Sequence, residues 1–254
     1  MKIENIDNGN TFDFGKTSAE YAKYRDIYPK ELYHRLYELG VGHKGCSWLD
    51  IGTGTGVLPL NMYLYGADIK AIDISECQID AGKLLAKEKG AENIEFSVSP
   101  AEETPFEDNS FDCITAAQCF WYFDREKIIE EIKRLLKPNG IFVKIYMSYT
   151  LLDEIAKRSH TLVKTLNKNW TPGASGSKDM YNHPFVNGQL DIFDCKLPFT
   201  RESWHGRMIA CRGTKASMDK ETLVRWEKAH TELLSKYPKE FEINHKIYIA
   251  TYKL

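Results

Sequence analysis

Short apolar runs and longer segments with apolar positions three or four residues apart alternate through residues 46–148. Apolar runs of strand length predict strands at 47–51, 67–74, 93–99, 111–117 and 141–148. The segments with helical spacing predict helices at 57–66, 75–90 and 124–137. This alternation is typical of a parallel sheet that is covered by helices on both faces.

Residues that favour helix ends set the predicted boundaries. Asp124 is a good N-cap for the helix 124–137, and Pro138-Asn139-Gly140 is expected to stop it. Upstream, residues 17–39 predict a helix broken once, because Thr17 and Glu20 have capping-box spacing and Pro29 begins a second helical segment. In parallel sheets ligands bind beyond the carboxyl ends of the strands, so functional residues are expected where the strands stop.

The alternation ends after residue 150. Residues 151–168 and 219–236 predict helices, 169–189 is loop-like, and 190–200 and 242–254 predict strands that complete the sheet. We therefore expect an α/β fold.

The composition argues against several classes of partner and location. With 34 Lys and Arg against 36 Asp and Glu the formal charge is -2, which disfavours a nucleic-acid partner. No apolar run reaches the ~20 residues that a membrane span needs, and the N-terminal segment lacks the apolar region of a secretory signal. The six cysteines form no CxxC motif, so we expect reduced thiols in a cytoplasmic protein without a metal site.

The sequence Leu-Asp-Ile-Gly-Thr-Gly-Thr-Gly at 49–56 carries the strongest chemical signal. Glycines after a strand allow a tight turn into a helix and a close approach of the backbone to a ligand. A dinucleotide site uses GxGxxG, but the third glycine position of that pattern is Val57 here. Asp50 would repel a pyrophosphate and suits a cationic group such as the amino acid end of S-adenosylmethionine. Asp73 ends the next strand, where a carboxylate can accept both hydroxyls of a ribose.

Several motifs occur together in order: LDIGTGTG (49–56), AIDIS (71–75), the segment 99–124 and RLLKPNG (134–140). On these motifs the chain resembles the class I S-adenosylmethionine-dependent methyltransferases, in the small-molecule group that contains the ubiquinone/menaquinone and trans-aconitate types. The resemblance implies a doubly wound, mostly parallel seven-stranded sheet of Rossmann-like type with an N-terminal helical lid and a substrate-cap insertion.

The expected organisation is one methyltransferase domain over residues 1–254. Its parts are the lid (17–40), the cofactor-binding core (41–148), the cap (151–189 and 201–240) and the C-terminal strands (190–200 and 242–254). The resemblance covers roughly residues 17–150, and the similarity to the family is weaker after residue 150. Trp170 and the loop 171–188 are further lid candidates.

The resemblance also implies cofactor contacts. Asp50, Gly52, Thr53 and Gly54 would meet the methionine part, Asp73 the ribose and Ile74 the adenine face. The remaining expected contacts lie near the adenine edge, beneath the sulfonium and in the lid: Ser99, Ala101, Glu102, Ala116, Gln118, Tyr24 and Arg25. Pro100 stands where the family usually has an acidic side chain, so the adenine amino group needs another acceptor.

For the acceptor side, Trp121 and Tyr122 follow the fourth strand of the core, where the family places residues near the transferred methyl. Further substrate candidates lie in the expected cap: Trp204, His205, Arg207 and Arg212. His205 and Tyr122 are the candidate catalytic groups. Each also has a purely structural interpretation, as a packed ring, a hydrogen-bonded histidine or a solvated charge.

The sequence thus predicts a methyltransferase that uses S-adenosylmethionine and a small-molecule acceptor, as a monomer or homodimer, with neither a nucleic-acid nor a membrane partner. In-line methyl transfer depends mainly on positioning and desolvation, so the lack of an obvious base does not exclude an enzyme. A non-catalytic S-adenosylmethionine-binding protein and, less favoured, a nicotinamide-dependent oxidoreductase remain alternatives.

Overall fold

The computed structural model describes all residues except 1, 5, 172 and 173. The chain divides into two compact units. We call Tyr28–Tyr146, Gly176–Ile192 and Ile247–Leu254 the sheet unit, and Met1–Ile27, Met147–Ser175 and Phe193–Lys246 the helical unit. The prediction of one domain with a lid and a cap stays a prediction.

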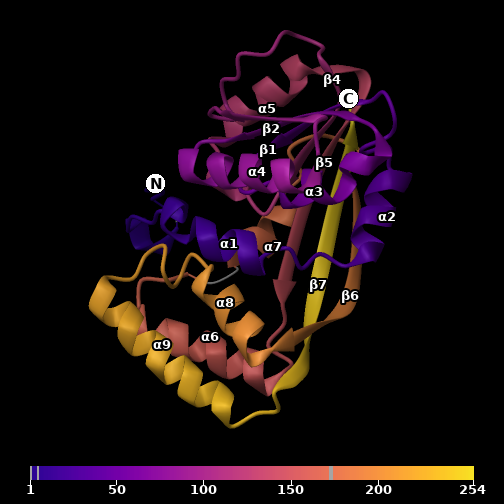
Figure 1. The fold of residues 1–254 in the computed structure, drawn as a ribbon. Coiled ribbons are helices and arrows are strands. Elements are labelled where there is room, and N and C mark those ends of the chain that lie inside the picture. Colours follow the sequence, from indigo (N-terminus) through magenta and orange to yellow (C-terminus); the bar gives the residue numbers. More distant parts are fainter. Residues whose placement is uncertain (1, 5, 172–173) are drawn as a thin grey trace. The chain divides into compact units, whose positions relative to one another are not determined.

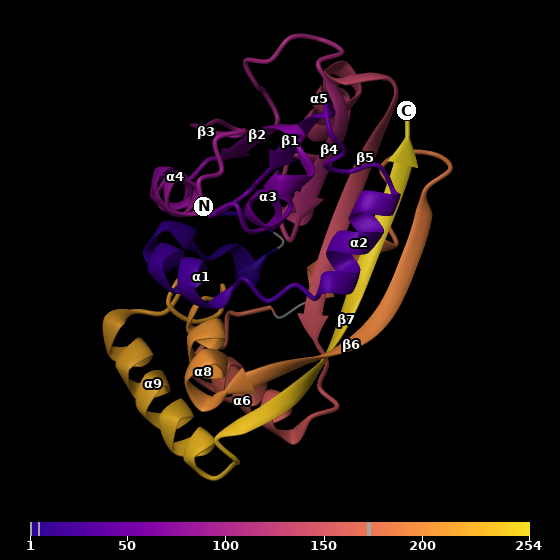
Figure 2. The same ribbon diagram turned by 45° about the vertical axis from the view of Figure 1, so that its right-hand side comes forward.

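Within the described residues, one sheet has the strand order β3-β2-β1-β4-β5-β7-β6. Its strands are β1 (Ser47–Ile51), β2 (Asp68–Asp73), β3 (Ile94–Val98), β4 (Phe111–Ala117), β5 (Leu136–Tyr149), β6 (Gln189–Thr200) and β7 (Glu240–Lys253). The pairs β1–β2, β1–β4, β2–β3 and β4–β5 are parallel. β7 runs against β5, because Leu254 N–H bonds to Gly140 O whereas Thr150 N–H bonds to Asn244 O (Figure 2). The predicted mostly parallel, seven-stranded α/β sheet is confirmed.

Helices on opposite faces make the sheet doubly wound. α3 (Val57–Met62) and α4 (Glu76–Lys89) connect strands that progress from β1 toward β3, whereas α5 (Arg125–Leu135) connects β4 to β5 in the other direction. Since such crossovers are right-handed, opposite directions place the helices on opposite faces, as Figure 1 shows. The carboxyl ends of β1, β2 and β4 consequently meet at one edge of the sheet.

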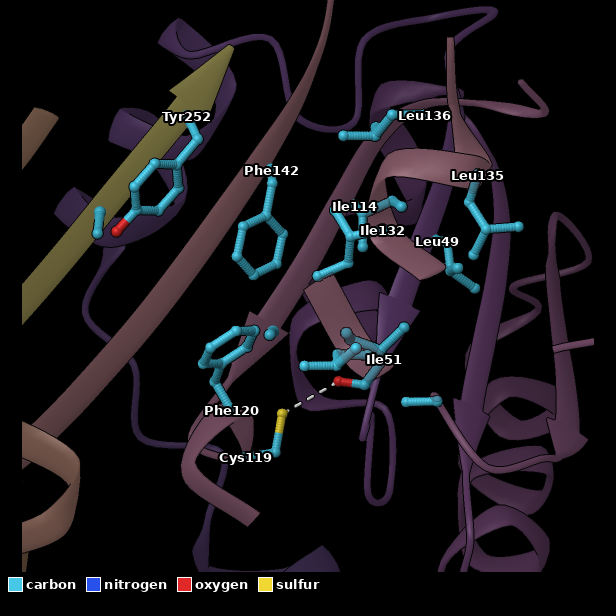
Figure 3. Close-up of a cluster of buried hydrophobic side chains, with 14 of the residues drawn as sticks. Leu49, Ile51, Ile114, Cys119, Phe120, Ile132, Leu135, Leu136, Phe142 and Tyr252 are labelled. Atoms are coloured by element: carbon cyan, nitrogen blue, oxygen red, sulfur yellow. Dashed lines mark hydrogen bonds between the residues drawn. The ribbon is translucent and has the colours of Figure 1, made fainter. Parts of the chain in front are cut away.

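An apolar cluster fixes these strand ends (Figure 3). Leu49 and Ile51 of β1 contribute to it together with Ile114 of β4 and Ile132 of α5. Cys119 Sγ donates a hydrogen bond to the Ile51 carbonyl oxygen at 3.2 Å. The end of β1 is therefore packed on its neighbours at the point where the chain enters the glycine turn.

The end of α5 differs from the prediction. Asp124 is the N-cap, as expected, and accepts bonds from the backbone N–H groups of Glu126 and Lys127. The helix nevertheless ends at Leu135, and Pro138-Asn139-Gly140 lies inside β5. The β4–β5 register shifts there, Asn139 has φ +66°, and a Cβ on Gly140 would lie 2.8 Å from Lys137 O. These residues form a strand irregularity instead of a helix stop.

Two further expectations need correction. The Thr17–Glu20 capping box does not form, because Thr17 Oγ1 donates to Phe14 O and leaves α1 (Ser18–Tyr24) without a side-chain cap. The expected loop 169–189 contains α7 (Ala174–Met180), and its residues 172–173 lie outside the described residues. α2 (Lys30–Glu38) follows Pro29, as predicted.

The helical unit contains α6 (Glu154–Leu166), α8 (Arg201–Ile209) and α9 (Lys220–Ser235) besides α1. α8 begins with a capping box between Thr200 and Ser203, which the sequence pattern did not reveal. No helix in the described part of the chain combines the length and the apolar character that a membrane span requires.

Candidate functional site

The glycine turn directly follows β1 and leads into α3. Gly52, Gly54 and Gly56 all have positive φ angles, of +61°, +59° and +79°. A Cβ on Gly52 would lie 2.8 Å from Cys119 Sγ, and one on Gly56 would lie 2.5 Å from Phe96 Cζ. Both positions therefore require glycine for conformation and for space.

Asp50 is the central polar residue beneath this turn. Its side chain is 2% exposed, and its two oxygens accept hydroxyl bonds from Thr53 at 2.6 Å and Thr115 at 2.5 Å. Thr115 Oγ1 in turn accepts a bond from Trp48 Nε1. Burial raises the pKa of Asp50 to about 7, although both hydroxyls oppose the rise. The carboxyl group thus links the turn to β1 and β4.

Asp73, the last residue of β2, binds the backbone of the glycine turn. Its Oδ2 accepts the Gly54 N–H and its Oδ1 accepts the Ser75 N–H, each at 2.9 Å. Burial raises the pKa of this carboxyl as well. Because each carboxylate oxygen has two lone pairs, both retain acceptor capacity for a ligand hydroxyl. The structure therefore brings Asp50, Asp73 and the glycine turn together.

The predicted adenine contacts lie beside Asp73. Ile74 is 63% exposed, which leaves its side chain accessible to a flat ligand. Ser99 N–H bonds to the Asp73 carbonyl oxygen, while Ala101 is buried in the apolar cluster. Glu102 Oε1 accepts the backbone N–H of Asp124 at 3.0 Å.

The end of β4 adds an unusual backbone and several negative charges. Ala116 is fully buried and pairs with Lys144, and Gln118 has φ +64° with its N–H bonded to Ile145 O. The pKa of the Cys119 thiol is raised by burial and then by four carboxylates, those of Asp50, Asp73, Asp179 and Glu102. Asp179 is paired with Lys144 and Arg125, so the negative potential that favours a cationic ligand comes from the other three carboxylates.

A series of contacting aromatic rings begins at the predicted acceptor residues Trp121 and Tyr122 and continues within the sheet unit. Trp121 contacts Tyr122 and Tyr146, with ring centroids 5.2 and 5.3 Å apart. Tyr146 contacts Tyr248, which contacts Tyr181 of the segment after α7. The buried indole N–H of Trp121 has no hydrogen-bond partner among the described residues. We call these five side chains the aromatic row.

Lys144, which was not among the predicted residues, lies next to this row. Lys144 is 1% exposed and bonds to Asp179 Oδ2 at 2.9 Å and to the Asp179 carbonyl oxygen at 2.7 Å. Its ammonium also lies 5.0 Å from the centre of the Phe120 ring. A lone lysine in the apolar run IFVKIYMS is the signal that could have identified it, because a buried charge in a strand needs a partner.

The other predicted residues belong to the helical unit, so their roles at the site stay predictions. Tyr24 donates its hydroxyl to Glu202 Oε1 at 3.0 Å, and its ring occupies the space where Gly206 lacks a side chain. Arg25 lies over the Tyr21 ring at 5.0 Å. Both residues are thereby held within the helical unit.

The candidate base His205 is part of a buried network. Its Nδ1 lies 2.8 Å from His230 Nδ1, and His230 Nε2 lies 2.9 Å from Ser159 Oγ. Trp204 is fully buried and donates its indole N–H to the same Ser159 oxygen. Burial lowers the pKa of His205, which favours the neutral form that a base requires.

The two arginine candidates are also engaged within the helical unit. Arg207 is buried, stacks over the Tyr149 ring at 4.7 Å and bonds to Cys211 Sγ at 2.9 Å. Arg212 pairs with Asp7 through two nitrogens, at 2.8 and 3.1 Å. A substrate carboxylate at Arg212 would have to compete with Asp7.

The burial of Asp50 predicts a specific pH dependence of stability. Because its pKa is raised from 3.8 to about 7, Asp50 favours folding when protonated, and this contribution is lost as the pH rises through about 7. The amide side chain of an Asp50→Asn variant cannot ionise. The variant's free energy of unfolding relative to the wild type is therefore expected to rise by about 2 to 3 kcal/mol between pH 5 and pH 8. Urea titrations at both pH values measure it, and a constant difference would contradict the raised pKa.

Comparisons with known proteins identify the family of the chain. Residues 49–144 match the family model described as a methyltransferase domain. The chain is 31% identical over 193 residues to the uncharacterized methyltransferase YcgJ of Bacillus subtilis (strain 168), and the alignment covers 72% of each protein. It is 31% identical over 124 residues to a ubiquinone biosynthesis O-methyltransferase of Acinetobacter baumannii, which covers 48% of this chain and 52% of that protein.

The crystal structure of YcgJ superimposes with a TM-score of 0.55 at 22% identity, covering 87% of this chain and 97% of YcgJ. This superposition shows a shared fold. Together with the relatives it confirms the resemblance inferred from the motifs and removes support for an oxidoreductase. The chain belongs to the methyltransferase family.

Proposed function

We propose that the protein transfers a methyl group from S-adenosylmethionine to a small-molecule acceptor. The observation that carries the proposal is the joined arrangement of Asp50, the glycine turn and Asp73 at the carboxyl ends of β1 and β2. When bound, S-adenosylmethionine supplies an electrophilic methyl group on a positively charged sulfur. We infer further that the protein acts in the cytoplasm, as a monomer or homodimer.

The residues of the sheet unit fit this cofactor. The Gly52–Gly54 backbone carries no Cβ at its two glycines that would obstruct a close approach, and Thr53 is held by Asp50. Asp73 offers the remaining acceptor capacity of its oxygens to the two ribose hydroxyls. The exposed side chain of Ile74 provides an apolar surface for adenine.

The charges of this region support a cationic ligand. The negative charge of Asp73 contributes to the raised pKa of Asp50, after burial. A bound cation nearby would favour both carboxylates in their charged forms. An anionic pyrophosphate would have the opposite effect, which agrees with the absence of the GxGxxG spacing.

The aromatic row supports an acceptor with a flat or apolar part. Trp121 and Tyr146 present rings for packing, and the Trp121 indole N–H can donate a hydrogen bond to an acceptor oxygen. In this proposal the row orients the acceptor and excludes water, and Tyr122 takes a proton where the acceptor arrives protonated. His205 stays a candidate base within the helical unit.

The ribose assignment predicts a loss of cofactor affinity in Asp73→Asn. The amide removes one charged acceptor and places an N–H where an acceptor is needed, so the dissociation constant for S-adenosylmethionine should rise about 10-fold or more. Isothermal titration calorimetry measures the constant. Asp68→Asn is the matched control, because Asp68 is an exposed aspartate at the other end of β2, and its affinity should stay at the wild-type value.

Unchanged binding in Asp73→Asn would remove the ribose assignment but not the proposed reaction. No binding of S-adenosylmethionine or S-adenosylhomocysteine to the wild-type protein at high micromolar concentration would contradict the function itself. Thermal unfolding of each variant shows whether the turn stays folded.

The acceptor is expected to appear in a metabolite-extract screen with S-adenosylmethionine carrying a labelled methyl group. A labelled small molecule should form with the wild-type protein. Trp121→Phe, which keeps a ring but lacks the indole N–H, should lower kcat/KM for that acceptor about 10-fold. Cofactor binding without any labelled product would instead favour a non-catalytic binding protein.

A further inference from the structure

Two cysteines lie side by side at the edge of the sheet opposite the glycine turn. Cys46 immediately precedes β1, and Cys113 lies near the start of β4. Their sulfur atoms are 3.5 Å apart in a thiol–thiol contact. The proposed cofactor function uses neither residue, because the glycine turn follows the other end of β1 and Asp73 lies at the corresponding end of β2.

The surrounding contacts hold the two chain segments that carry the thiols beside one another. Trp48 of β1 pairs with Cys113 of β4 in the parallel ladder. The residue after Cys46 is tied to the residue before Cys113, since Ser47 N–H donates to Asp112 Oδ2 at 2.8 Å. A bond between the sulfurs needs a separation of about 2.0 Å, so closure brings the two sulfur atoms about 1.5 Å nearer to one another.

The two thiols differ in access and in acidity. Cys46 is half-buried, whereas Cys113 is 1% exposed. The hydrogen bond with Cys113 lowers the pKa of Cys46, against the opposing effects of burial and of the Asp112 carboxylate. A backbone hydrogen bond at Gly42 and the charge of Lys137 act in the same direction as Cys113. Burial raises the pKa of Cys113 well above its ordinary value. Cys46 is consequently the more reactive thiol and Cys113 the resolving one.

We propose that Cys46 and Cys113 form a redox-active dithiol that closes to an intramolecular disulfide with hydrogen peroxide as oxidant. The Cys46 thiolate attacks one peroxide oxygen, the O–O bond breaks, and Cys46 becomes a sulfenic acid while hydroxide leaves and takes a proton to form water. The Cys113 sulfur then attacks the Cys46 sulfur, the S–O bond breaks, and a second water is released. The two sulfurs lose two electrons, which reduce one peroxide to two waters.

Peptide mapping of the full-length protein tests this proposal. The reduced protein is treated with equimolar hydrogen peroxide, free thiols are alkylated, and the digest is analysed by mass spectrometry without reductant. A peptide linking Cys46 to Cys113 is expected, lighter by about 2 Da than the sum of its two thiol peptides and lost on reduction. Cys77, which is exposed in α4, should be alkylated in the same sample.

Variants separate this pair from the other thiols. Cys46→Ser should abolish the cross-link, whereas Cys77→Ser should leave its yield unchanged. In Cys113→Ala the sulfenic acid of Cys46 should persist and react with dimedone. Should Cys113→Ala fail to fold, the wild-type map still decides the matter, because both thiols must disappear together. Free Cys46 and Cys113 at a peroxide dose that oxidises Cys77, or a cross-link to another cysteine, would overturn the proposal.

Discussion

The buried carboxyl group of Asp50 is the constraint on which the proposed site depends. A carboxyl group removed from water loses its solvation, and here two threonine hydroxyls replace part of it. Those threonines come from different places, since Thr53 lies in the glycine turn and Thr115 lies in β4. Satisfying one buried group therefore fixes the direction in which the chain leaves β1.

The remaining parts of the site follow from that direction. With the turn held from below by Asp50, its Gly54 N–H reaches the Asp73 carboxylate at the end of β2. The Cys119 side chain occupies the space that a Cβ on Gly52 would need, and its thiol donates to the Ile51 carbonyl oxygen. The segment after β4 is thereby held against the end of β1. Polar groups of three neighbouring strands thus meet at one edge of the sheet, where a charged and polar cofactor can be bound by short contacts.

Most of this core can be predicted from the sequence, because its signals are local. Buried parallel strands leave apolar runs, and the glycine spacing and the aspartates follow the strand ends directly. The sequence does not show which distant residues become partners. Lys144 and Asp179 are 35 positions apart, and Arg212 and Asp7 are 205 apart. The Pro138–Gly140 segment has the composition of a helix stop, and only the pairing of β4 with β5 shows that it is a strand irregularity.

Hydrogen–deuterium exchange with and without S-adenosylhomocysteine is the sharpest test of the cofactor site, because it reports where the ligand binds rather than whether it binds. Slower exchange is expected at the amides of residues 52–56, 73–75, 99, 101 and 102, and unchanged exchange in the strand starts around Ser47 and Asp68. Protection elsewhere, with the glycine turn exchanging at its unliganded rate, would contradict the assignment of the cofactor site.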